Sequence, residues 1–154
     1  MTIAHESRGQ GSPTLVLLHG IGGGRTIWSA SLESLAEAGF TAVAVDLPGY
    51  GGSAAMAPGG VHLMAASVVN LLDALDLPKA VIVGHSMGGM VAQEVAAEHP
   101  RRVAGLVLAC TSPAFGRADG EWQSSFVRAR RAPLDGGQGI AGRAARLARG
   151  MMGP

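Results

Sequence analysis

Four short apolar runs, separated by stretches of helical spacing, constrain the fold of this chain more than any other feature. The runs cover residues 14–18, 41–45, 80–83 and 103–109 and consist largely of Val, Leu, Ile and Ala. Apolar residues occupy consecutive rather than alternate positions in each run, which is typical of strands buried on both faces of a parallel sheet. We therefore expect a sheet that helices cover on both sides.

The stretches between the runs place apolar residues three and four positions apart. One extends from Ile27 to Leu35 and is followed by Gly39, where the C-terminal cap of a helix is expected. A second extends from Val61 to Leu75. A third begins at Met87 and stops before Pro100, because proline cannot continue a helix. This alternation predicts an α/β fold whose parallel strands are joined by right-handed crossovers.

Length and composition fit one ordinary domain, with 154 residues of which 47% are hydrophobic. The net charge of +1 predicts no nucleic-acid partner. The single cysteine, Cys110, excludes an internal disulfide framework and a thiolate zinc cluster, and no other spacing of ligand residues indicates a metal site. No apolar run reaches the ~18 residues of a membrane span, and the first residues lack the apolar segment of a signal peptide. We therefore expect a cytoplasmic chain without a membrane partner.

Gly84-His85-Ser86-Met87-Gly88 is the motif with the clearest chemical meaning. It follows the run 80–83 and opens a helical stretch, which is the strand–turn–helix context of a G-x-S-x-G nucleophile elbow. A serine at such a tight turn needs strained backbone angles, and Gly84 and Gly88 avoid clashes with the neighbouring strand and helix. The Ser86 hydroxyl is then expected at the carboxyl edge of the sheet, beside a helix N-terminus that can stabilise an oxyanion. Ser86 is therefore the candidate catalytic nucleophile.

A glycine-rich segment, His19-Gly20-Ile21-Gly22-Gly23-Gly24, follows the first run. An oxyanion hole needs two backbone N–H donors, and glycines allow a loop to approach the reacting oxygen closely. We expect the N–H groups of Ile21 and Met87 to be these donors. We expect His19 to brace the loop rather than to transfer protons.

A third motif, Asp46-Leu47-Pro48-Gly49-Tyr50-Gly51-Gly52-Ser53, follows the second run and by itself indicates a turn-rich structural loop. In this order the three motifs resemble the α/β-hydrolase family. The likeness is closest to its small-molecule esterases, its carbon–carbon bond hydrolases and its lactonases, such as 3-oxoadipate enol-lactonases. The resemblance covers residues 3–114. It implies a three-layer core with a mostly parallel sheet, Ser86 as the nucleophile, Ile21 and Met87 at the oxyanion hole, no cofactor, and a small ester or lactone as substrate.

The same resemblance assigns residues 1–114 to the N-terminal part of the hydrolase core and residues 115–154 to the start of a helical lid. The composition changes at this point, because residues 115–154 carry seven arginines and only three carboxylates. A further helical spacing within this region joins Ile140, Ala144, Leu147 and Met151. We expect an ordinary solvated helix there, the alternative being a basic helix that binds a membrane surface or a partner.

A complete catalytic triad cannot be assigned from this sequence. The family order is Ser, then Asp or Glu, then His, and only His99 follows Ser86. His99 ends the helix that Ser86 begins, about 20 Å away at ~1.5 Å per residue, so it cannot be the base. Asp119 is the one downstream carboxylate in a comparable position for the acid. We therefore expect the N-terminal portion of a longer hydrolase, truncated before the last strands and poorly active alone, with the triad acid and histidine missing.

The sequence leaves open one function of a different class, a catalytically incomplete chain of the same fold that only binds a ligand or partner. Within the enzyme class, the resemblance does not separate ester or lactone hydrolysis from carbon–carbon bond cleavage or cofactor-free haloperoxidase chemistry. A dinucleotide site at Gly49–Ala54, which fits G-x-G-x-x-A, is disfavoured because no helical spacing begins directly after it. Strands missing beyond residues 103–109 would also leave a sheet edge unpaired, and we expect this edge to favour self-association.

Overall fold

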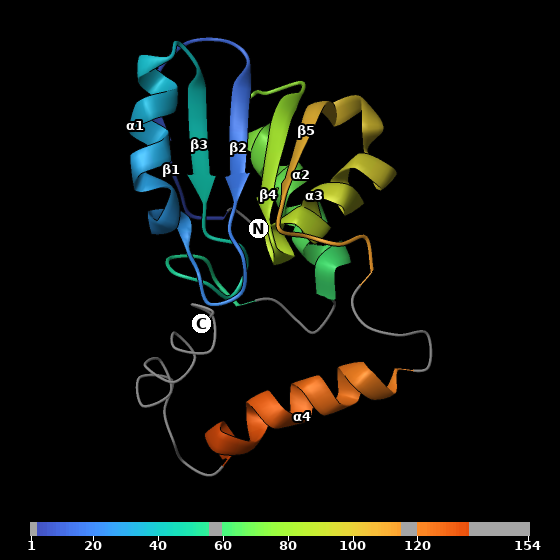
Figure 1. Ribbon diagram of the computed structural model, residues 1–154. Helices are drawn as coiled ribbons and strands as arrows, with labels where there is room; N and C mark the ends of the chain where they lie inside the picture. The colour runs from blue at the N-terminus through green and yellow to red at the C-terminus, as the bar shows by residue number, and fades with distance from the viewer. Residues whose placement is uncertain (1–2, 56–59, 115–119, 136–154) are drawn as a thin grey trace. The chain divides into compact units, whose positions relative to one another are not determined.

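The computed structural model of the protein describes residues 3–55, 60–114 and 120–135 (Figure 1). The chain divides into two compact units, Met1–Pro113 and Ala114–Pro154. The strands of the first unit are β1 (His5–Arg8), β2 (Thr14–Leu18), β3 (Thr41–Val45), β4 (Ala80–His85) and β5 (Val103–Ala109). Its helices are α1 (Ser29–Glu37), α2 (Gly60–Ala74) and α3 (Met87–Glu98), with 3-10 turns at Arg25–Trp28 and Pro100–Arg102. The predicted alternation of strands and helices is confirmed.

The five strands form one mostly parallel sheet in the order β1-β3-β2-β4-β5. The strands β2 to β5 run parallel to one another, and β1 pairs antiparallel with β3 at one edge. Where β2 and β4 end, Leu18 lies opposite Gly84. The loops that follow these two central strands therefore leave the same carboxyl edge side by side, which is where ligands of open α/β sheets bind.

Helices cover both faces of the sheet, and the side chains of β2 show how. Leu17 packs in one apolar cluster with Leu32 of α1, whereas Val16 and Leu18 belong to a second cluster that includes residues of α2 and α3. In Figure 1, α1 lies on one side of the sheet and α2 and α3 lie on the other. These three layers confirm the predicted architecture and explain why apolar residues occupy consecutive positions in the central runs.

The first helix begins later than its apolar spacing predicted. Ile27 belongs to the 3-10 turn Arg25–Trp28 and is half exposed, and α1 starts only at Ser29. The Arg25 N–H donates to the Asp46 carboxylate at 2.7 Å, so a contact distant in sequence fixes the backbone where the helix was expected to begin. The other end agrees with the prediction, since Gly39 follows the helix with φ +87°.

The run that forms β5 was expected to be buried on both faces, and this expectation was wrong. Leu106, Val107 and Leu108 are 38%, 48% and 43% exposed. In the part of the chain that the structure describes, β5 pairs with β4 alone, on the side away from β2. An apolar run therefore predicts a strand suited to burial, but the burial itself depends on which segments pack against it.

Of the second unit, the structure describes α4 (Glu121–Asp135), in which the rings of Trp122 and Phe126 stack with centroids 4.9 Å apart. Residue Asp119 and the helical spacing predicted for residues 140–151 lie outside the described residues. None of the helices in the described ranges combines the length and the apolar composition that crossing a membrane requires.

Candidate active site

Ser86 occupies the single position between the end of β4 and the start of α3. Its backbone angles are φ +53° and ψ −117°, a conformation that is strained for a residue with a side chain. Besides the bonds that its carbonyl accepts from α3, two hydrogen bonds link it to β5 and the residues that follow: the Ser86 N–H donates to the Ala109 carbonyl at 2.9 Å, and the Thr111 hydroxyl donates to the Ser86 carbonyl at 2.7 Å. The end of β5 and the residues after it therefore stabilise the predicted elbow.

The glycines of the elbow are required by close backbone contacts. A Cβ added to Gly84 would lie 2.4 Å from the Gly88 carbonyl oxygen, and a Cβ on Gly88 would lie 2.4 Å from the Leu18 carbonyl oxygen. Neither obstacle is a flexible side chain, so the strand, the turn and the helix could not pack this closely with any other residue. This is the steric reason expected from the sequence for glycine on both sides of Ser86.

The glycine-rich loop after β2 lies against the elbow. A Cβ on Gly20 would be only 3.0 Å from the Ser86 Cβ. The Gly23 N–H donates to the Gly20 carbonyl at 3.1 Å, which closes a tight turn and leaves the Ile21 side chain 70% exposed. The structure therefore brings the loop that carries Ile21 beside Ser86, and Met87 follows Ser86 directly as the first residue of α3.

His19 links this loop to the one that follows β3. The imidazole is fully buried. Its Nδ1 lies 2.8 Å from the Gly20 carbonyl and its Nε2 accepts a hydrogen bond from the Leu47 N–H at 3.0 Å. Because a carbonyl only accepts, Nδ1 carries the proton and both ring nitrogens are occupied. His19 thus braces the loop, as expected, and has no free nitrogen to take a proton from Ser86.

Asp46 is a second link between the two loops, and the sequence did not reveal it. Its side chain is 3% exposed and accepts hydrogen bonds from the backbone N–H groups of Arg25 (2.7 Å) and Gly52 (2.9 Å) and from the Arg25 guanidinium. Burial raises the pKa of Asp46, but these backbone hydrogen bonds and the Arg25 charge outweigh it and hold the pKa below its usual value. The one sign of this contact in the sequence is the glycine at position 51. Gly51 has φ +49°, and a Cβ there would overlap the Asp46 carboxylate.

Tyr50 is another neighbour of the site that sequence reasoning missed. Its ring meets the His19 ring edge-on with centroids 4.8 Å apart, and its hydroxyl lies 3.7 Å from the Met87 sulfur. Burial raises the pKa of the Tyr50 hydroxyl, and a backbone hydrogen bond from Gly22 opposes this. Tyr50 therefore contacts both segments that were expected to supply the oxyanion donors.

The remaining histidines occupy other positions. His85 precedes Ser86, and its buried Nδ1 has no hydrogen-bond partner among the described residues. His5 lies on β1, His62 near the start of α2, and His99 at the C-terminal end of α3. All five histidines lie in the described ranges, and no hydrogen bond there joins any of them to the Ser86 hydroxyl.

The chain belongs to the α/β-hydrolase fold family, whose model matches residues 13–146. It is 41% identical over 125 residues to the dihydrolipoyllysine-residue acetyltransferase component of the acetoin cleaving system of Pseudomonas putida, a match that covers 80% of this chain and 34% of that protein. It is 44% identical over 110 residues to the pimeloyl-acyl-carrier-protein methyl ester esterase of Citrobacter koseri, covering 71% of this chain and 41% of that one.

The fold is also similar to that of solved structures in the same class. The enol-lactonase from Burkholderia xenovorans LB400 superposes with a TM-score of 0.72 at 26% identity, over 83% of this chain and 50% of the lactonase. The chain thus spans between a third and a half of the length of these relatives.

Proposed function

We propose that this chain carries the nucleophile and the oxyanion-binding segment of a serine hydrolase that acts on a small carboxylic ester or lactone. One observation carries the proposal: the strained Ser86 between β4 and α3, with the glycine-rich loop of β2 packed against it. The names of two relatives, a methyl ester esterase and an enol-lactonase, support the substrate class.

In the proposed reaction the Ser86 hydroxyl oxygen attacks the carbonyl carbon of the substrate while a general base removes its proton. The carbonyl oxygen becomes an oxyanion that accepts hydrogen bonds from the Ile21 and Met87 N–H groups, each worth about 10²–10³ in turnover by analogy with other oxyanion donors. The tetrahedral intermediate then expels the alcohol, which takes the proton from the base. Water releases the acid from the acyl-Ser86 ester by the same steps in reverse order.

The general base is the part of this chemistry that the described residues do not supply. Since His19 has both nitrogens engaged and no other histidine bonds Ser86, we expect the chain alone to hydrolyse activated aryl esters only slowly. Loss of the base alone costs on the order of 10⁶ in turnover in a triad that acts as a unit. Turnover at ordinary hydrolase rates that Ser86→Ala abolishes would contradict this expectation.

A fluorophosphonate probe tests the nucleophile directly. The probe is applied to the 154-residue chain and to any longer chain that its reading frame encodes, and the labelled peptide is identified by mass spectrometry. We expect a covalent adduct on Ser86 of the longer chain, absent from Ser86→Ala and retained in Ser34→Ala, which removes an exposed serine on α1. The 154-residue chain should be labelled much more slowly, because none of its described residues supplies the general base. A longer chain that remains unlabelled at Ser86 would refute acyl-enzyme chemistry.

The alternative is a chain of this fold that binds a ligand without converting it to product. One observation favours this alternative: among the described residues, no histidine forms a hydrogen bond with the Ser86 hydroxyl. The two functions differ in the longer chain. A binding protein would retain an ester unchanged and its affinity would not depend on the Ser86 hydroxyl, whereas the hydrolase would release the acid and lose this activity in Ser86→Ala.

A further inference from the structure

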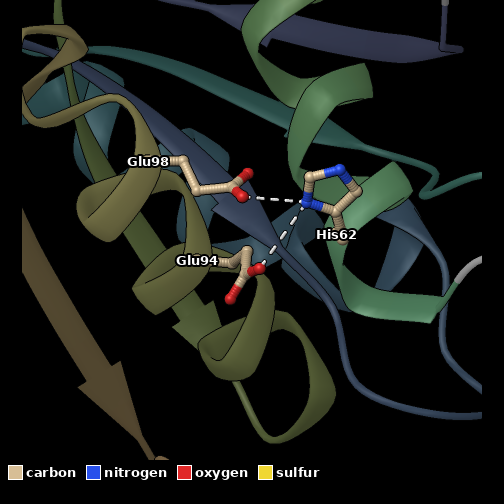
Figure 2. Close-up of side chains that lie close together, drawn as sticks. All are labelled: His62, Glu94 and Glu98. Atoms are coloured by element: carbon tan, nitrogen blue, oxygen red, sulfur yellow. Dashed lines mark ion pairs between the residues drawn. The ribbon is translucent and has the colours of Figure 1, made fainter.

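A cluster of metal-ligating side chains lies between α2 and α3, apart from Ser86 (Figure 2). His62 stands near the start of α2, and Glu94 and Glu98 stand one turn apart on α3, so they project from the same face of that helix. The Nδ1 of His62 lies 2.9 Å from Oε1 of Glu98 and 3.7 Å from Oε1 of Glu94. One ligand atom of each residue lies within 4.8 Å of the other two.

We propose that these three side chains bind a divalent transition-metal ion of the Zn²⁺ type, which would join α2 to α3. One imidazole nitrogen and two carboxylate oxygens form a donor set that suits Zn²⁺ and leaves a fourth position for water. Zinc–ligand bonds of about 2.0–2.1 Å in tetrahedral geometry place ligand atoms roughly 3.3 Å apart. The two nitrogen–oxygen distances observed here lie on either side of that value, so small rotations of partly exposed side chains would complete the site.

The charges of the cluster favour a divalent ion over a simple ion pair. The two glutamates are like charges at i, i+4, which destabilises a helix when nothing neutralises them. Among the described residues, His62 is the ion-pair partner that lies closest to both carboxylates. A protonated imidazole supplies one positive charge for two carboxylates, whereas a divalent ion neutralises both and leaves the imidazole as a neutral ligand.

The nitrogen ligand also selects the class of metal. Mg²⁺ and Ca²⁺ prefer sites made of oxygen ligands alone, whereas imidazole suits Zn²⁺, Ni²⁺ and Cu²⁺. The sequence gave no sign of this site because His62 lies far from the glutamates along the chain. Only the packing of α2 against α3 brings them together, and the site does not depend on the proposed hydrolase function.

Titration calorimetry with Zn²⁺ tests the proposal on the full chain. Cys110→Ser serves as the background, because the exposed Cys110 thiol could itself bind zinc. We expect one Zn²⁺ per chain, with binding weakened at least about tenfold by His62→Ala or by Glu98→Gln, since each removes one of three ligands. His5→Ala and Glu37→Gln, which remove an exposed imidazole and an exposed carboxylate elsewhere, are expected to keep the wild-type affinity.

A spectroscopic readout tests the ligand geometry separately. Co²⁺ in place of Zn²⁺ should give visible absorption bands of tetrahedral intensity that His62→Ala abolishes. Circular dichroism establishes that each variant folds, and His62→Gln replaces His62→Ala if the latter does not. No saturable Zn²⁺ binding at millimolar concentration, unchanged affinity without His62, or equally tight binding of Mg²⁺ would each overturn the proposal. Zn²⁺ binding should be unaltered in Ser86→Ala. Failure of the metal-site proposal can therefore be distinguished from failure of the proposed hydrolase function.

Discussion

The carboxylate of Asp46 accepts hydrogen bonds from both the backbone N–H and the guanidinium of Arg25, so a residue at the end of β3 holds the loop that follows β2. This loop is the one that packs against Ser86 through Gly20. The position of the expected oxyanion donor Ile21 therefore depends on an ion pair between a buried carboxylate and a partly exposed guanidinium, which takes no part in the proposed chemistry.

Removing the Asp46 carboxylate should destabilise the chain strongly. Asp46→Ala leaves the Arg25 and Gly52 N–H groups and the Arg25 charge without their acceptor, and breaking such a pair costs about 3 kcal/mol. Arg25→Ala should cost less, about 1–2 kcal/mol, because the guanidinium is partly exposed and both backbone hydrogen bonds to Asp46 remain. Urea denaturation measures both free energies of unfolding.

The matched control for these variants is Glu33→Ala, which removes an exposed ion pair with Arg8. We expect a cost below about 1 kcal/mol for this surface pair. Equal effects of Asp46→Ala and Glu33→Ala would mean that Asp46 does not anchor the loops.

The Asp46 interactions should also make stability depend on pH. The pKa of Asp46 in the folded chain is lowered from its ordinary value of 3.8, because hydrogen bonds and the Arg25 charge outweigh the effect of burial. A carboxyl group with a lowered folded pKa stabilises the fold fully above its unfolded pKa, and this contribution disappears as the pH falls through the folded pKa. The stability advantage of wild type over Asp46→Asn should thus be constant above about pH 5 and shrink below about pH 4. An advantage that stays constant down to pH 3 in urea titrations would contradict the assignment.

The sequence predicted the features of the fold that depend on residues close together along the chain. The elbow around Ser86 requires glycine two positions before and two positions after the serine. Gly84 and Gly88 meet this requirement, so the motif can be recognised within five consecutive residues. The central runs have apolar residues at consecutive positions because both faces of the parallel sheet are covered. Neither inference needed knowledge of which distant segments come together.

The features that the sequence did not reveal all depend on tertiary contacts. Asp46 had the appearance of a turn residue, and only the packing of its loop against Arg25 makes it a buried anion. The prediction that α1 begins near Ile27 was wrong because the contact between Asp46 and the Arg25 N–H fixes a 3-10 turn there. The apolar composition of β5 likewise could not show which segments cover it.

Gly88→Ala should destabilise the elbow mainly through steric overlap of the added methyl group, and by more than the loss of glycine's conformational freedom would. The Cβ of Gly88→Ala would lie 2.4 Å from the Leu18 carbonyl oxygen, and backbone cannot move away without separating α3 from β2. We expect a loss of about 3 kcal/mol, at the upper end of overpacking effects. Gly22→Ala is the control, because Gly22 has φ +76° but no atom within 4 Å of its Cβ position, and it should cost only about 1 kcal/mol. A smaller loss for Gly88→Ala than for Gly22→Ala would disprove the steric account.

The outer edge of β5 should make the chain self-associate through pairing with a second copy. In the described part of the chain this strand pairs with β4 alone, and its exposed Leu106, Val107 and Leu108 add apolar surface beside the edge that has no strand partner. Sedimentation analysis should show an average mass that rises with protein concentration. Val107→Lys should suppress this rise, since a charged side chain on an edge strand opposes pairing. Val127→Lys on α4 changes a valine of almost equal exposure, 47%, and should leave association unchanged; suppression by both variants to the same extent would place the contact elsewhere than β5.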